Sequence, residues 1–214
     1  MTIGTVRALS AVLVLGLPHG SGGEKPAVVT FVSAKPGGLP AGFHSMSSSG
    51  REPGLWQVTS VGAVVALSQT DLGRRGYRLA VLDDVAIQDV RVGVRLRVGR
   101  GDRAAGVAWR VQNPQNYYAA RLDFESREVV LYKFVGGNRI RLSGLSGIRL
   151  DADAWHDLVV EHENNRIRVW LNGIPVASDE DGSLRPAGTL GFWMPGDGTA
   201  HFSRLWYQAL PDHR

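Results

Sequence analysis

The stretch WHDLVVEHENNRIRVWLNG, residues 155–173, carries carboxylates two positions apart before an Asn-Asn pair and arginines two positions apart after it. A row of carboxylates can supply general acid–base catalysis. If Asn164 and Asn165 form a two-residue turn, however, each acid faces an arginine, as Glu161 faces Arg168. A carboxylate beside a guanidinium is stabilised in its charged form, which suits neither a general acid nor a proton-sharing pair. We therefore predict a ladder of ion pairs here, each contributing about 0.2–1 kcal/mol.

The same register gives this hairpin one apolar face. That face consists of Leu158, Val160, Ile167, Val169 and Leu171. A slip of one residue would turn these side chains outward, so the register is strongly specified. A second turn at 172–173 returns the chain and is expected to place Ile174 opposite Leu171 and Val176 opposite Val169.

Arginine and tyrosine side chains gather in residues 106–142, which read as strands joined by hairpins. One face of these strands is apolar and is expected to collect Val107, Trp109, Val111, Tyr118, Leu122, Phe124, Leu131 and Leu142. The opposite face is expected to collect Arg110, Tyr117, Arg121, Asp123, Tyr132 and Arg141. Tyrosine rings can stack on a pyranose, and guanidiniums can donate fixed hydrogen bonds to hydroxyls or carboxylates.

Short alternating runs separated by Gly, Asn, Asp and Pro must position these side chains. The clearest run is DVRVGVRLRV, residues 89–98, in which valine and leucine alternate with arginine. Many short strands without intervening helix predict an all-β fold, an antiparallel β-sandwich of the jelly-roll type.

Composition and the N-terminus limit the possible classes of protein. A chain of 214 residues with 43% hydrophobic residues and no cysteine can bury one core without disulfides. The net charge of +4 is spread along the chain, so we expect no nucleic-acid partner. An apolar run at residues 8–17 follows Arg7 and is too short to cross a bilayer. We predict a signal peptide at residues 1–23, a single domain at 24–214, and secretion or export to the periplasm.

The sequence gives little support for a metal site. The six histidines show no His-x-His or His-x-x-x-His spacing, which argues against zinc. The loop SDEDGS could offer oxygens of Asp179, Glu180 and Asp181 to a structural Ca²⁺. We predict no metal site and no cofactor, with this calcium site as the alternative.

Several scaffold motifs together resemble a known superfamily. They are GVAWR (106–110), NYY (116–118), LYK (131–133), Trp155-His156, NRIRVWLNG (165–173), GTLGFW (188–193) and Phe202. Their order resembles the concanavalin A-like lectin and glucanase superfamily, and within it the laminin G-like and 3-keto-disaccharide hydrolase branch. The resemblance covers residues 28–210. It implies a jelly roll with Arg110 on the sugar-facing sheet, while Asp123 is the first acid after the NYY motif.

Two functions follow from these observations. The first is a secreted, non-catalytic carbohydrate-recognition domain that binds a glycan through Arg110, Tyr117, Arg121, Tyr132 and Arg141. The alternative is a hydrolase of 3-keto-glycosides, with Asp123 or a histidine as the catalytic base. A polar face that is merely solvated remains open as well. Protein partners and oligomeric state are not indicated by the sequence.

The signal-peptide prediction is tested by intact mass after export. We expect the mature chain to begin between Gly20 and Lys25, where small residues follow the apolar run. Exported protein that still begins at Met1 would show that this segment is not cleaved.

Overall fold

The computed structural model describes residues 25–50, 53–72, 76–101 and 103–211. The predicted signal peptide at 1–23 lies outside these ranges. The described residues form strands, turns and loops without an α-helix. It follows that they contain no helix able to span a bilayer.

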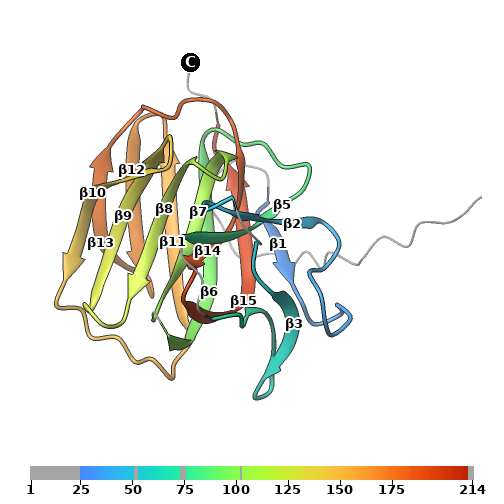
Figure 1. Cartoon of the computed structure of the whole chain (residues 1–214). Coiled ribbons are helices and arrows are strands. Elements are labelled where there is room, and N and C mark those ends of the chain that lie inside the picture. The colour runs from blue at the N-terminus through green and yellow to red at the C-terminus, as the bar shows by residue number, and fades with distance from the viewer. Residues whose placement is uncertain (1–24, 51–52, 73–75, 102, 212–214) are drawn as a thin grey trace, which may run out of the picture.

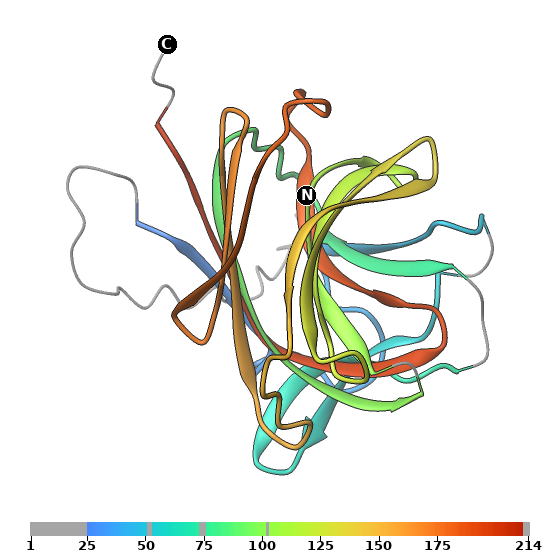
Figure 2. The same cartoon turned by 90° about the vertical axis from the view of Figure 1, so that its left-hand side faces the viewer.

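Two antiparallel sheets face each other (Figures 1 and 2), and their inward side chains form an apolar core. The eight-stranded sheet has the order β13 (Ile174–Glu180), β12 (Arg166–Leu171), β11 (His156–Glu163), β6 (Val90–Gly101), β15 (Gly198–Ala209), β4 (Val64–Gln69) and β3 (Trp56–Val61), with β1 (Ala27–Thr30) paired to β15. The seven-stranded sheet has the order β10 (Asn138–Ser146), β9 (Glu128–Val135), β8 (Asn116–Asp123), β7 (Ala104–Asn113), β14 (Thr189–Pro195), β5 (Tyr77–Leu82) and β2 (Phe43–Ser47).

The prediction of an all-β antiparallel sandwich is confirmed. The strand expected from alternation at 89–98 forms most of β6, whose valines and leucine are buried while its arginines face outward. Strand β6 lies in the middle of its sheet, between β11 and β15. It therefore contributes to the core on one face and to the protein surface on the other.

The core between the sheets is built from the inward side chains of both. Trp109 and Tyr118 stack at a centroid distance of 5.6 Å, and Phe192 packs on Phe202 at 4.4 Å across the two sheets. Trp155, one of the residues that carry the family resemblance, is only half-buried and does not belong to the apolar core clusters.

The predicted register of the 155–173 hairpin is confirmed, because Glu161 pairs with Arg168 and Glu163 with Arg166. The expected pairing of Val176 with Val169 is wrong. A bulge after Val169 places Ala177 opposite it, while Pro175 pairs with Trp170. Proline lacks a backbone N–H and is confined to sheet edges and bulges, and β13 is such an edge strand.

Lys133 provides an unexpected polar contact at the margin of the core. It points to the apolar side of β9, and its ammonium reaches the Asp181 carboxylate and the Ser183 hydroxyl. The same carboxylate accepts a hydrogen bond from the Tyr118 hydroxyl. Burial acts to raise the pKa of Asp181, but these hydrogen bonds outweigh it and hold that pKa well below its usual range. The loop after β13 is thereby tied to the seven-stranded sheet.

A buried tryptophan–histidine hydrogen bond links the two sheets. The Trp109 indole Nε1 donates to His162 Nδ1 at 3.0 Å, so the neutral imidazole carries its proton on Nε2. The ring is fully buried, and that burial, together with the charge of Arg110, lowers the pKa of His162 to about 3. The folded protein therefore keeps this histidine neutral at physiological pH.

This burial predicts a pH-dependent stability. The unfolded chain protonates His162 below a pKa of about 6.5, whereas the folded chain does so only near 3. The free energy of unfolding should fall as pH decreases through this window, by up to about 1.4 kcal/mol per pH unit from this residue.

Denaturant unfolding of wild type and His162→Gln checks this expectation. Glutamine can still accept the Trp109 N–H but does not titrate, so the stability gap between the two proteins should narrow as the pH falls from 6.5. A gap that is constant over that range would contradict the assignment.

Candidate functional site

Apart from Arg110, the predicted sugar-binding side chains lie on the outer face of the seven-stranded sheet, and this face is filled with aromatic rings. Tyr117 stacks on Phe134 at a centroid distance of 4.3 Å, and Tyr77 packs against Phe134 at 5.0 Å and Trp193 at 5.1 Å. Together with small and branched residues, these rings form a second apolar cluster. The rings cover one another instead of presenting flat faces to solvent.

Neither predicted tyrosine is free to stack on a sugar. Tyr117 is fully buried, its hydroxyl accepts a hydrogen bond from Trp193 Nε1, and burial raises the pKa of its phenol. Tyr132 is 6% exposed, and the guanidiniums of Arg121 and Arg139 lie 5.6 Å and 5.0 Å from its ring centroid. The interpretation of these tyrosines as exposed rings is wrong, because the rings cover each other and two arginines cover their margin.

Asp123, the candidate base, caps a turn. One carboxylate oxygen accepts hydrogen bonds from the backbone N–H groups of Glu125 and Ser126, and the other accepts one from Arg121. The side chain is 11% exposed. These contacts fix the β8–β9 turn and leave Asp123 poorly placed to take a proton from a substrate.

Arg141 lies at the sheet edge and is half-exposed. Both of its Nη atoms bind one oxygen of Glu128 at 3.1 Å, across the β9–β10 ladder. Of the predicted arginines it is the one whose guanidinium reaches solvent to a large extent, since Arg121 is mostly covered.

Arg110 does not join the predicted row. Its backbone adopts a φ of 46° in a bulge of β7, which breaks the alternation that the prediction assumed. The guanidinium is buried and donates to Gln88 O at 2.6 Å, Leu184 O at 3.2 Å, Asn164 O at 3.0 Å and Asp89 Oδ1 at 2.9 Å. Burial lowers its pKa, although Asp89 opposes this effect. Arg110 therefore clamps three loops together.

The loop considered for calcium makes contacts within the protein instead. Asp181 is bound to Lys133 and Tyr118, as described above, and the positive charge of Lys133 opposes a cation at the same carboxylate. Within the part of the chain that the structure describes, three or more His, Cys, Asp or Glu side chains do not gather into a potential metal site.

The outer face of the eight-stranded sheet offers a different surface, an apolar row that crosses six strands. We call it the tryptophan row. Pairing across the strands places its members side by side, in the order Val28, Trp206, Gly93, Val159, Trp170 and Pro175. The strand neighbours of the four central members belong to the core or pack on it, so alternation turns those four residues to the outer face. Val29, next to Val28, also packs on the core, whereas Pro175 lies beside the exposed Ile174 and is itself exposed on the edge strand β13.

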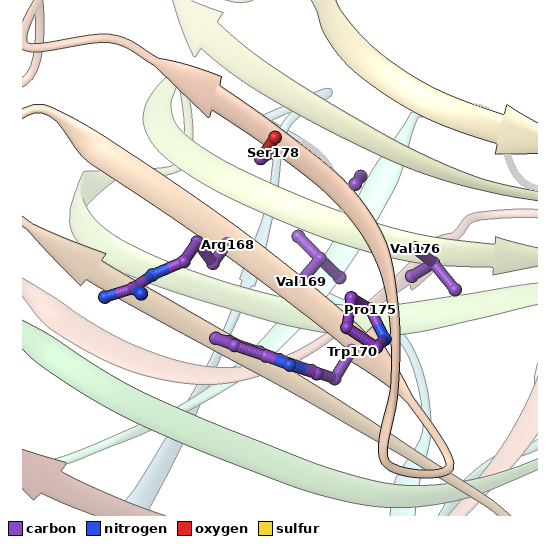
Figure 3. A pocket seen from close by; sticks show the side chains of 7 residues that line it. Arg168, Val169, Trp170, Pro175, Val176 and Ser178 are labelled. Carbon is purple, nitrogen blue, oxygen red and sulfur yellow. The ribbon is translucent and has the colours of Figure 1, made fainter.

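The two indoles are half-buried and rest on the sheet. A Cβ built on Gly93 would lie 2.3 Å from Trp206 Nε1 and 2.5 Å from Cε2, so the ring lies directly over this glycine. At the other end, Trp170 borders a hollow of about 410 Å³ that is also lined by Arg168, Pro175 and Ser178 (Figure 3). The guanidinium of Arg91 lies 5.4 Å from the Trp170 ring centroid.

Charged rows flank the tryptophan row on both sides. On one side Glu161 lies between Arg91 and Arg168 and binds both. On the other side Arg95 lies between Asp157 and Arg204, and both arginines bind the Asp157 carboxylate. Each carboxylate is thus shared by two guanidiniums. An apolar strip between polar margins is the arrangement expected where a pyranose ring stacks and its hydroxyls need hydrogen-bond partners.

This surface was missed in the sequence, although one signal was available. Trp170 occupies an outward position on a strand whose other outward residues are arginines, and its pairing with Val159 follows from the predicted register. Trp206 could not be joined to it, because β15 pairs with β6 across more than 100 residues of chain.

Comparisons with known proteins agree with the fold. No protein-family model matches the chain, and no match was found among the curated proteins. The carbohydrate-binding module CBM66 from Bacillus subtilis is 20% identical at a TM-score of 0.64, covering 77% of this chain and 95% of its own. The exoplasmic domain of VIP36, in a Ca²⁺/Man3GlcNAc-bound form, is 12% identical at 0.55, covering 83% and 87%.

A glycosidase has the same fold. A prokaryotic β-1,3-1,4-glucanase from a mouse hindgut metagenome is 12% identical at a TM-score of 0.59, covering 86% of this chain and 99% of its own. At these identities the likeness establishes a concanavalin A-like or galectin-like jelly roll shared by sugar-binding proteins and glycosidases.

The outer faces of the two sheets predict losses of stability of different size when a ring is deleted. Trp193→Ala removes a fully buried ring and should cost roughly 3–5 kcal/mol. Trp206→Ala and Trp170→Ala remove half-buried rings and should each cost about 1–2 kcal/mol. Denaturant unfolding at neutral pH measures the three values, and a loss at Trp206 as large as that at Trp193 would place Trp206 in the core.

Proposed function

We propose that this chain is an exported, non-catalytic carbohydrate-recognition domain that binds a glycan on the tryptophan row. The observation that carries the proposal is the position of Trp206 and Trp170 in one row, half-buried and turned outward, with polar side chains on both sides. A contiguous apolar surface rimmed by polar residues is typical of interaction and ligand-binding sites.

The geometry of the row fits an extended ligand. Trp206 and Trp170 are three strand spacings apart, which is roughly 14 Å at about 4.8 Å per spacing. Each indole can stack on the apolar face of a sugar ring, while the side chains of the flanking rows can bind hydroxyls. A linear oligosaccharide lying across the strands would contact both rings.

The similar structures support a sugar ligand, since they include a carbohydrate-binding module and the exoplasmic/lumenal domain of VIP36 in a Ca²⁺/Man3GlcNAc-bound form. They also include glycosidases, so the hydrolase alternative needs a separate argument. The base considered for that reaction, Asp123, is engaged by Arg121 and two backbone N–H groups. This engagement favours binding over catalysis.

Export is part of this proposal, and the N-terminal sequence pattern supports it. The apolar run after Arg7 is typical of a signal peptide, and the absence of cysteine makes folding independent of the redox state outside the cell. We propose that the ligand is encountered in the periplasm or outside the cell.

Binding to a glycan array by wild type and variants tests the proposal. Trp206→Ala and Trp170→Ala should each weaken the preferred glycan by roughly 1–3 kcal/mol, because each removes a stacking surface. Gly93→Ala should also weaken it, since the new Cβ displaces the Trp206 ring without removing it.

Tyr77→Ala and Asp123→Asn serve as controls on the opposite sheet. Tyr77 is a half-buried ring and Asp123 is the candidate base, so both should leave glycan affinity unchanged if the proteins remain folded. If wild type turns over a 3-keto-glycoside and Asp123→Asn does not, the hydrolase function replaces this proposal. Full affinity in all three tryptophan-row variants would remove the row as the site.

A further inference from the structure

We infer that the ligand of the tryptophan row is an anionic polysaccharide, bound along its length with carboxylate or sulfate groups on the flanking arginines. This inference rests on the proposed function and adds the chemical class of its ligand. Its basis is the juxtaposition of an apolar row with two rows in which guanidiniums outnumber carboxylates.

The charge balance beside the row is positive on both sides. Arg91 and Arg168 share Glu161, and Arg95 and Arg204 share Asp157, so each flanking row holds two positive charges against one negative charge. An arginine has five N–H donors, and one shared carboxylate satisfies only a few of the donors that two guanidiniums present. The remaining donors suit the planar oxygens of a carboxylate or a sulfate.

The exposed fractions of the arginine and carboxylate side chains beside the row can also be compared. The four guanidinium-bearing side chains are 37–46% exposed, whereas Glu161 is 15% exposed. Asp157 is intermediate at 35%. Glu161 therefore lies beneath or beside its two guanidiniums, and a ligand that approaches that side of the row meets the positive groups first. Asp157 is about as exposed as Arg204, so on the other side the excess of positive charge comes from the number of arginines.

The margins of the face are not basic, which confines the anion preference to the tryptophan row. At one margin Arg166 pairs in register with Glu163 and Glu180, which leaves an excess of negative charge there. At the other, Arg97 binds Asp153 and lies opposite His201, whose pKa is lowered by burial and by Arg97. The excess of guanidinium is thus local to the two rows beside the indoles.

The row also sets the direction in which the polysaccharide lies across the strands. Its six members span five strand spacings, roughly 24 Å at about 4.8 Å each, and both ends reach open strand edges or surface loops. A polymer can therefore pass over the face without ending on it. Sugar rings meet Trp206 and Trp170, and their anionic substituents point sideways to the arginines.

The test compares polymers that share a backbone and differ in charge. Surface plasmon resonance on immobilised polygalacturonate and its fully methyl-esterified form isolates the carboxylates. Cellulose sulfate and hydroxyethyl cellulose form a second pair that isolates the sulfate. We expect at least one anionic polymer to bind roughly tenfold more tightly than its neutral partner, with affinity falling as salt is added.

Charge variants separate the row from general attraction between a basic protein and a polyanion. Glu161→Gln removes the competing carboxylate and should strengthen binding of the anionic polymer roughly two- to fivefold, whereas Arg95→Gln should weaken it by a similar factor. Glu128→Gln and Arg141→Gln make the same changes of net charge on the other sheet and should have little effect. A gain of affinity cannot arise from misfolding.

The outcomes distinguish the inference from the proposed function. Equal affinity for neutral and anionic polymers, lost in Trp206→Ala, would overturn the inference and leave a site for neutral glycans. Equal effects of the charge changes on the two sheets would also overturn it. Binding of neither kind of polymer, and of no glycan on the array, would overturn the proposed function itself.

Discussion

The register of β6 between β11 and β15 is the constraint on which both the core and the candidate site depend. Val92 and Val94 point into the core, and the intervening Gly93 points outward. Because side chains alternate along a strand, the pairing that buries these valines also places Val159 and Trp206 beside Gly93. A residue with a Cβ at this position would collide with the indole. The fold therefore sets the site through the same pairing that stabilises it.

The seven-stranded sheet shows how an expected binding face can become structural. Its outer side chains were predicted from alternation to be arginines and tyrosines, and most of them do point outward. The rings then pack on Phe134, Trp193 and Tyr77, which come from neighbouring or distant strands, and form a second apolar layer. Burial of these rings stabilises the sheet and removes the flat surfaces that a sugar would need.

The polar contacts inside the sandwich serve to position loops. Arg110 binds three backbone carbonyls and Asp89, and Lys133 holds Asp181 beneath the loop that follows β13. Both charged groups have their hydrogen-bond partners within the protein, as buried charges require. In contrast, the arginines beside the tryptophan row are exposed and share their carboxylates. This difference separates structural arginines from those available to a ligand.

The sequence by itself determined the fold class and most strand positions, together with the Glu161–Arg168 register, because alternation and turn residues act over short stretches of chain. It could not place Arg110, since a bulge with positive φ interrupts alternation without a sequence signal such as glycine. It could not show that Tyr117 is covered, because Trp193 lies 76 residues away. The tryptophan row likewise exists only after β1, β15, β6, β11, β12 and β13 have assembled. Tertiary structure decided the site because pairing between distant strands brings its residues together.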